Sequence, residues 1–174
     1  MKKIVSLIVV LCMVITMLCA CSDANGQVKE DANQVAFVEN SGLFEASDVS
    51  DNVPIDGAGF KIEVKKASDG YAKFVITGKD GKETVDYYKF DFATGEVEKY
   101  HYVAMMGVGF YYYYDMEKSE LVRLEDDGHK DTTQSSKDSG RWDGAAEDTA
   151  NEIKSIEDYF TKTFSMSIEE YVAK

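Results

Sequence analysis

Residues 87–100 read "YYKFDFATGEVEKY", and residues 111–124 repeat the pattern as "YYYYDMEKSELVRL". In each copy two tyrosines precede an Asp, at position 91 or 115, and a short turn follows before a Glu opens the returning half. An Asp placed before a turn accepts hydrogen bonds from the turn amides. Each copy therefore predicts one β-hairpin, and two copies are too few to indicate a propeller or a solenoid.

The segments around these hairpins also alternate apolar and polar residues. Phe60, Ile62 and Val64 share one face of a strand, and Asp80-Gly81 fits a tight hairpin turn further on. The connections are too short for the crossover helices of a parallel sheet, so an antiparallel meander of about six strands is predicted. In chain order the predicted strands are 60–65, 71–77, 84–92, 96–105, 108–115 and 120–125.

The C-terminal part of the chain changes to a helical period. Residues 126–142 are polar and predict a mobile loop, after which Asp143 is expected to cap a helix. That helix carries one apolar stripe, made of Ile153, Ile156, Phe160 and Phe164. Ser167 and Glu170 fit the capping box of a final short helix. The stripe must cover the sheet, so the expected fold class is α+β, an antiparallel β-meander of about six strands packed against a C-terminal α-helix.

Residues 1–20 have the form of an export signal. Lys2 and Lys3 precede an apolar run from Ile4 to Leu18, and the small residue Ala20 follows. The run is shorter than the roughly 20 apolar residues that cross a bilayer as a permanent helix. Polar, acidic chain comes next, so a cleaved signal peptide is expected rather than a retained membrane span.

The end of this signal, Leu18-Cys19-Ala20-Cys21, resembles the lipobox of bacterial lipoproteins. The resemblance implies that Cys21 receives a diacylglycerol and that the signal is cut just before it. Acyl chains would then hold the mature protein on the extracytoplasmic face of the bacterial cell membrane. Cys12 and Cys19 would leave with the signal, so no thiol would remain for a disulfide, a metal or a nucleophile.

Residues 21–52 are predicted to be a flexible tether, and residues 53–174 a single folded domain. The tether segment is rich in Ser, Asp, Asn and small residues, and its few apolar positions follow neither the strand period nor the helix period. Within it, "QVAFVEN" is compatible with a short element. The tether would separate the folded domain from the membrane surface.

Within the first hairpin, "YYKFDFATGEV", residues 87–97, resembles the hairpin of PepSY-type domains, which are small extracytoplasmic modules. Strands of that family often read Asp-x-x-Thr-Gly-Glu-Val, and this pattern runs here from Asp91 to Val97. The family has a helix ahead of these strands, whereas this sequence shows none there. The resemblance implies an extracytoplasmic module and does not alter the expected fold.

The chain carries a formal net charge of −13 at pH 7. Nucleic-acid binding needs clustered Lys and Arg that contact phosphates, whereas acidic residues predominate here. Adhesion to anionic lipids is disfavoured for the same reason. We therefore expect no nucleic-acid partner, a membrane contact made by the acyl anchor alone, and a well-solvated surface.

The inventory of reactive side chains disfavours catalysis. Of the two His in the chain, His101 lies beside Val97 and Val103 in a predicted strand, where a partly buried structural role is expected, and His129 lies in the polar loop. The sequence has no nucleophile elbow, His-Glu-x-x-His pair or Gly-rich phosphate loop. Residues 124–131, "LEDDGHKD", lack the ligand spacing of a calcium loop. We expect a protein that is not an enzyme and that holds no metal or cofactor.

The aromatic block "GFYYYYD" is the most distinctive feature of the predicted domain. A strand alternates its side chains, so this block puts aromatic rings on both faces of the sheet. Ordinary sheet packing accounts for such residues, but one face could instead form a flat aromatic platform for a ligand or partner. The candidate platform residues are Tyr88, Tyr100, Tyr102, Phe110, Tyr112 and Tyr114.

The leading hypothesis is a non-catalytic, membrane-anchored extracytoplasmic lipoprotein that binds a protein or peptide partner through the sheet face or edge. The alternative is a lipoprotein that captures a glycan or a small apolar molecule on the Tyr-rich surface, where Met105 and Met106 would supply adaptable contacts. A third hypothesis is a hydrolase with unrecognised residues. An exposed apolar patch without a cleft would favour the first, an enclosed aromatic pocket the second, and a His or carboxylate pair converging in a cleft the third.

Overall fold

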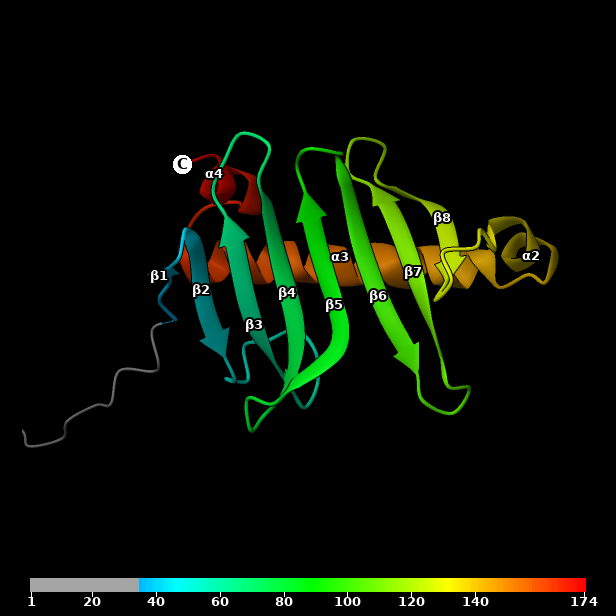
Figure 1. Cartoon of the computed structure of the whole chain (residues 1–174), viewed down its shortest axis with the longest axis horizontal. Helices are drawn as coiled ribbons and strands as arrows, with labels where there is room; N and C mark the ends of the chain where they lie inside the picture. The colour runs from blue at the N-terminus through cyan, green and yellow to red at the C-terminus, as the bar shows by residue number, and fades with distance from the viewer. Residues whose placement is uncertain (1–34) are drawn as a thin grey trace, which may run out of the picture. The chain divides into compact units, whose positions relative to one another are not determined.

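One antiparallel sheet of eight strands forms the frame of the fold, and its strands lie side by side in the order in which they occur in the chain (Figure 1). The computed structural model describes residues 35–174, so the predicted signal peptide and Cys21 lie outside the described residues. This topology confirms the predicted antiparallel meander and the α+β class. The strands are β1 (Val38–Asn40), β2 (Leu43–Asp48), β3 (Ala58–Lys65), β4 (Tyr71–Gly78), β5 (Glu83–Asp91), β6 (Glu96–Val103), β7 (Val108–Asp115) and β8 (Glu120–Asp126).

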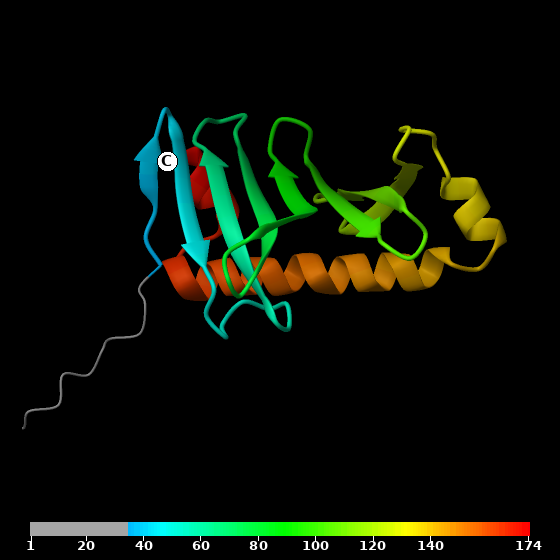
Figure 2. The same cartoon turned by 60° about the horizontal axis from the view of Figure 1, so that its bottom comes forward.

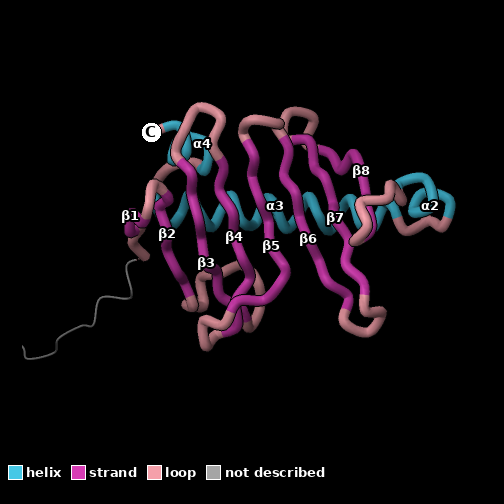
Figure 3. Tube along the Cα trace, in the orientation of Figure 1, coloured by secondary structure: helices cyan, strands magenta, loops and turns pink. Residues whose placement is uncertain are grey.

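The helices that follow the sheet are α2 (Thr133–Asp138), α3 (Trp142–Phe164) and α4 (Ile168–Ala173). Figures 1 and 2 show α3 running across the strands on one face of the sheet. The tube in Figure 3 places α2 beyond β8 at one end of α3 and α4 at the other end, beside β3 and β4. We call the face that packs on α3 the helix side and the other face the open face.

The strand count is eight rather than about six, because β1 and β2 lie within residues 21–52, which the sequence predicted to be a tether. β2 pairs with β3 and turns Phe44, Ala46 and Asp48 toward the helix side. Because the inward positions of β2 include the small Ala46 and the acidic Asp48, this segment lacks the apolar alternation that predicts a strand. The folded domain therefore begins well before its predicted start at residue 53.

Tight turns with positive φ close the hairpins. The predicted turn at Asp80-Gly81 joins β4 to β5, with Gly81 at a φ of 77°. The unpredicted turn between β1 and β2 has positive φ at both central residues, 53° at Ser41 and 84° at Gly42. This backbone suits the right-handed twist of paired strands, so a two-residue loop suffices there.

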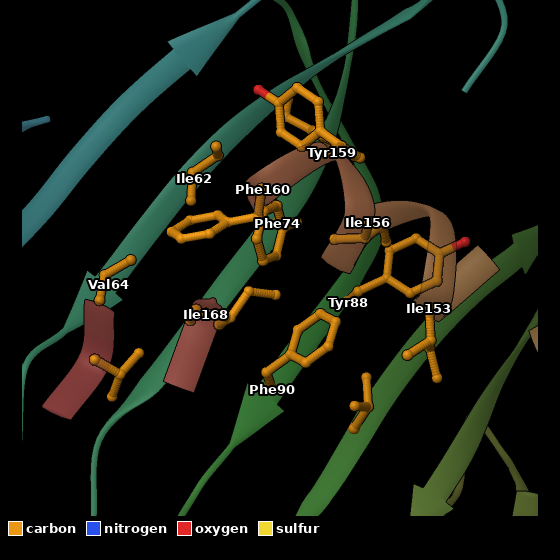
Figure 4. Close-up of a cluster of buried hydrophobic side chains, with 14 of the residues drawn as sticks. Ile62, Val64, Phe74, Tyr88, Phe90, Ile153, Ile156, Tyr159, Phe160 and Ile168 are labelled. Atoms are coloured by element: carbon orange, nitrogen blue, oxygen red, sulfur yellow. The ribbon is translucent and has the colours of Figure 1, made fainter. Parts of the chain in front are cut away.

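The hydrophobic core lies between the sheet and α3 (Figure 4). The sheet contributes alternate residues of its central strands, which are Phe60, Ile62, Val64, Phe74 and Phe90. From the predicted stripe of α3 the core takes Ile153, Ile156 and Phe160. The ring of Phe74 meets Phe60, Phe90 and Phe160 edge-on, with centroids 5.5, 5.6 and 6.0 Å away. Full burial of one such side chain stabilises the fold by about 1.5–3 kcal/mol.

The short helix α4 closes one end of the core with the predicted capping box. The Glu170 backbone N–H donates to Ser167 Oγ at 3.1 Å, and the Ser167 backbone N–H donates to Glu170 Oε2 at 3.0 Å. Ile168 and Val172 point inward from α4 and are buried. A left-handed residue, Ser165 with a φ of 58°, ends α3 and lets the chain turn back.

Residues 126–142, predicted to be a mobile loop, contain α2 and are tied to β8. The Leu124 backbone N–H donates to Thr133 Oγ1 at 2.9 Å, which links the start of α2 to the edge strand. Helix α3 begins earlier than expected, with Arg141 rather than Asp143 at its N-cap and no side-chain capping bond. Asp143 instead lies in the first turn, where its charge favours the positive end of the helix dipole.

Candidate functional site

The six aromatic residues of the candidate platform divide between the two faces of the sheet. Tyr100 and Tyr102 lie on the open face, whereas the helix side holds Tyr88, Phe110, Tyr112 and Tyr114. Tyr88 and Tyr114 belong to the core, with 4% and 9% of their surface exposed. The sheet therefore presents two different aromatic surfaces rather than one platform.

Tyrosines from three neighbouring strands form a row on the open face, which we call the tyrosine ladder: Tyr87 of β5, Tyr100 of β6, and Tyr111 and Tyr113 of β7. Consecutive ring centroids lie 5.9, 4.8 and 6.5 Å apart. His129 stacks on Tyr111 with a centroid distance of 4.6 Å, although the sequence placed it in a mobile loop. These distances are typical of packed aromatic pairs. Strand register, which the sequence alone did not provide, brings the ladder together.

Carboxylates hold the hydroxyl groups of the ladder. Three hydroxyls donate to them: Tyr87 to Glu98 Oε1 at 2.6 Å, Tyr100 to Asp127 Oδ1 at 2.8 Å, and Tyr113 to Glu125 Oε2 at 3.1 Å. The bond to Asp127 raises the pKa of Tyr100 to about 12. Burial, with the charges of Glu98 and Glu125, raises the pKa of Tyr113 to about 12. These phenols therefore remain protonated donors throughout the neutral range.

Cations of the protein cover both ends of the ladder. The Nζ atom of Lys73 lies 4.1 Å from the ring centroid of Tyr87. The guanidinium of Arg123 lies 3.9 Å from the ring centroid of Tyr113. Both distances are within the range of cation–π contacts. The tyrosine rings at both ends of the ladder therefore already have a cation of the protein against them.

The middle of the ladder, which we call the central pair, consists of Tyr100 and Tyr111. Both side chains are partly exposed, and no Lys or Arg among the described residues covers either ring. Burial raises the pKa of Tyr111, and the nearby carboxylates of Glu98, Asp127 and Glu125 raise it further. The central pair is thus a partly exposed aromatic surface among carboxylates, with His129 stacked on the Tyr111 ring.

An apolar tip adjoins the ladder at the start of β5 and the turn between β6 and β7. Val85 of β5 and Tyr102 of β6 come just beyond the paired residues Tyr87 and Tyr100. Val85 is 59% exposed and Tyr102 is 40% exposed, while Met105 at the turn is fully exposed. Tyr102 and Met105 were predicted from the sequence but Val85 was not, because strand alternation does not show which ends of a sheet stay exposed.

On the helix side, the N-terminal half of α3 leaves a hollow against β6, β7 and β8. The helix carries Gly144 and Ala145 there, whereas its C-terminal half carries bulky residues such as Ile153. Two adjoining cavities of about 460 and 350 Å³ share Tyr112, Arg141 and Ala145 as lining residues. We call them together the helix-side cleft, and each lies within the volume range of small-ligand sites.

Charged groups of both signs meet in this cleft. Lys99 is only 9% exposed, pairs with Glu152 of α3 and has its Nζ 4.9 Å from the ring centroid of Tyr112. Burial and the Glu152 carboxylate raise the pKa of Tyr112, while Arg141 lowers it and Asp148 adds to the increase. The charges of Glu152, Arg141 and Asp148 therefore all act on the Tyr112 hydroxyl.

His101 lies at the rim of the cleft and is not the partly buried residue that the sequence predicted. Its side chain is 48% exposed, and its Nδ1 lies 3.6 Å from Asp86 Oδ2. The residue is on the same side of β6 as the buried Val97, as expected. The residues of α3 that line the same cavity include the small Gly144 and Ala145.

A further hollow of about 700 Å³ lies at the other end of the helix side, between the β5–β6 turn, the end of β7 and α4. Phe92 and Met116 contribute apolar lining. Its charged lining residues are all carboxylates, namely Asp115, Glu117, Glu157 and Glu169. This groove therefore has the same preference for cations as the central pair.

The described part of the chain contains no group of three or more His, Cys, Asp or Glu side chains arranged to hold a metal ion. None of α2, α3 and α4 is long and apolar enough to span a membrane.

The fold and these surfaces define a two-layer α+β protein whose eight-stranded meander has an aromatic, acidic open face. No protein-family model matches the chain, and neither a curated protein nor a solved structure matches it. The resemblances to bacterial lipoproteins and to PepSY-type hairpins therefore stay predictions from the sequence.

Proposed function

We propose that the protein is a non-catalytic extracytoplasmic lipoprotein, anchored to the bacterial cell membrane through Cys21, that binds a basic protein or peptide through the open face. The observation that carries this proposal is the central pair. Tyr100 and Tyr111 lie among carboxylates, and among the described residues no Lys or Arg covers them, whereas both ends of the ladder have their own cations and His129 stacks on Tyr111.

A Lys or Arg side chain of the partner fits the central pair in two ways. Its cation over a tyrosine ring contributes about 0.5–1 kcal/mol at an exposed site and about 2 kcal/mol once water is removed. The carboxylates of Glu98 and Asp127, already beside the ladder, accept its hydrogen bonds. Tyr and Arg are also the residues that most often dominate protein interfaces.

The surroundings of the central pair favour the same partner. The apolar tip, which includes Met105, offers adaptable contacts to an apolar residue beside the partner's basic residue. The net charge of −13 attracts basic partners and speeds their encounter with the open face.

The location of this activity follows from the predicted signal and lipobox. A chain with such negative charge does not adhere to anionic lipid by itself, so an acyl anchor at Cys21 is what would keep it on the membrane. Mass spectrometry of the N-terminal peptide from the native host should find Cys21 carrying a diacylglycerol thioether. An unmodified sulfur, or a leader still attached, would overturn this part of the proposal.

A non-catalytic role fits the reactive side chains of the described residues. Lys99 and Glu152 neutralise each other as an ion pair. His101 has Asp86 as its partner, and His129 is stacked on the ladder and bonded to Glu125.

Capture of a small molecule is a second candidate function, and the helix-side cleft is the observation that favours it. A ligand site of that kind lies on the opposite side of the sheet from the central pair, so both functions can coexist in one domain.

Site-specific photocrosslinking tests the partner. A benzoylphenylalanine replaces Tyr111 in the full chain, expressed in its native host, and a matched chain carries the probe at Lys154, which is exposed on α3 away from the open face. We expect the probe at 111 alone to crosslink one protein, through a segment rich in Lys or Arg. The adduct should weaken when Glu98→Gln and Asp127→Asn are added.

Two results would reject the open face as the binding surface. One is equal crosslinking from 111 and 154, and the other is an adduct at 111 that the two carboxylate substitutions leave unchanged. Crosslinking to a segment without basic residues would reject the proposed class of partner.

A further inference from the structure

The helix-side cleft has a polar part and an apolar part that meet at Tyr112 and Arg141. The polar cavity, of about 460 Å³, is lined by charged groups from β6 and α3. The apolar cavity, of about 350 Å³, is lined by Met106, Phe110 and Leu124. A ligand that fills both parts must therefore carry charge at one end and an apolar group at the other.

One positive and one negative group of the cleft lack an ion-pair partner. Lys99 and Glu152 pair with each other, but neither Arg141 nor Asp148 makes an ion pair within the described residues. They are separated by seven positions, which is about 10 Å along a helix, and so cannot lie side by side on α3. Within the described residues, the Arg141 guanidinium makes one hydrogen bond, from Nε to the Ser139 hydroxyl at 2.9 Å.

A buried hydroxyl also lacks a partner at this place. Thr149 is 0% exposed, lines the polar cavity, and its Oγ1 makes no hydrogen bond with the described residues. Buried hydroxyl groups in folded proteins nearly always have a partner. Because Oγ1 is closed to solvent, a polar group of a ligand would bond to it once the Thr149 side chain turns toward the cavity.

We propose that the helix-side cleft binds a free α-amino acid with an apolar side chain. The ligand's ammonium group faces Asp148, its carboxylate faces Arg141, and its side chain enters the apolar cavity beside Phe110. The zwitterion matches one free charge of each sign, and the Thr149 hydroxyl gains a hydrogen bond from the same polar end. This site is independent of the partner surface proposed above, because it lies on the other side of the sheet.

Binding of L-phenylalanine to the full chain in mild detergent tests the proposal. Isothermal titration and thermal unfolding should show saturable binding and a rise in the unfolding temperature. The two half-molecules are the chemical controls: 3-phenylpropionate has only the carboxylate, and 2-phenylethylamine has only the ammonium group. Each should bind about 10- to 100-fold more weakly than L-phenylalanine, because one charge of the cleft is left without its partner.

Substitutions in the cleft locate the site. Arg141→Gln and Asp148→Asn should each weaken binding by about 10- to 100-fold, and both residues are exposed enough for the fold to tolerate the change. The matched controls Lys154→Gln and Asp143→Asn change the same charges outside the cleft and should leave binding unchanged. Thr149→Val should weaken binding without lowering the stability of the unliganded protein, since it removes a hydroxyl that has no partner there.

Three outcomes would overturn the inference. The first is the absence of saturable binding by L-phenylalanine, and the second is equal binding of either half-molecule. The third is binding that Arg141→Gln and Asp148→Asn do not affect, since the ligand would then occupy another place.

Discussion

Tyr159 and Asp48 show how one pair of residues joins the long helix to the edge of the sheet. The Tyr159 hydroxyl donates to Asp48 Oδ2 at 2.7 Å, and the Ser50 backbone N–H donates to Asp48 Oδ1 at 2.8 Å. Burial alone would raise the pKa of Asp48, but the hydrogen bonds from Ser50 and Tyr159 lower it below its ordinary value. The carboxylate is therefore charged at neutral pH although it lies in the interior.

Tyr159→Phe should lower the free energy of unfolding at pH 7 by about 1.5–3 kcal/mol, because a charged buried acceptor loses its donor. The pKa of Asp48 is lower in the folded than in the unfolded chain. Its stabilising effect is therefore present above a pH of about 4 and is lost as the pH falls through the folded pKa. Urea unfolding at pH 7 and in the acid range measures this loss in the free energy of unfolding and its dependence on pH.

The control for this prediction is Tyr102→Phe, which removes the same atom from a side chain that is 40% exposed. It should change the stability by less than about 0.5 kcal/mol at either pH. A deficit in Tyr159→Phe that is the same at neutral and acid pH would show that the charge of Asp48 plays no part.

This pair also shows which buried residues the sequence alone could not predict. Phe60, Ile62 and Val64 could be assigned to the core because they alternate with polar residues. Asp48 could not, since an inward acid contradicts the apolar pattern of a strand. Its partner lies 111 positions away, so no local pattern connects the two residues.

Helix α3 differs between its two halves. Its C-terminal half fills the core with Ile153, Ile156 and Phe160, whereas small residues such as Ala145 in its N-terminal half leave room for the helix-side cleft. The apolar stripe predicted the first half from the sequence. The cleft could not be predicted, because small helix residues create a cavity only when the facing strand is also known.

Helix α4 depends on its capping box, and Ser167→Ala should therefore destabilise the protein by about 1 kcal/mol. The substitution removes the acceptor for the Glu170 backbone N–H at the end that carries Ile168 into the core. Denaturant unfolding measures the loss. Ser155→Ala, the same change at an exposed position of α3, should be close to neutral, and an equal loss in both variants would contradict the capping role.

The sheet as a whole starts earlier than its sequence indicates, and residues ahead of β1 already belong to the fold. Phe37 packs on the two C-terminal helices, with its ring centroid 4.9 Å from that of Phe164 and 4.6 Å from that of Tyr171. The ends of the described chain thus meet in one aromatic cluster. A domain cut at Val53 would lack Phe37 and two strands.

Phe37→Ala should lower the free energy of unfolding by about 2 kcal/mol, somewhat less than the loss for a fully buried Phe, because Phe37 is half-buried. The neighbouring Val38 is 68% exposed, so Val38→Ala should change the stability by less than about 0.5 kcal/mol. The urea midpoints of the two variants measure these two losses in stability. Equal midpoints would mean that the segment ahead of β1 is dispensable.

For the whole molecule, the meander was predictable because each hairpin is encoded by a turn and its own two flanking strands. The number of strands was not, since β1 and β2 lack a clear apolar alternation. The tyrosine ladder depends on register across three strands, which brings Tyr87, Tyr100 and Tyr111 together although each was visible in the sequence. The partner surface is thus a property of strand pairing rather than of any one segment.

The order of the elements also governs how the protein is made. All eight strands are complete by Asp126, but the helix that covers their apolar side ends only at Phe164. During synthesis or export from the N-terminus, the apolar face of the sheet therefore stays exposed to water until the last part of the polypeptide has been made. A ribosome that stops early would release a fragment prone to aggregate, and such fragments would need chaperones or rapid proteolysis.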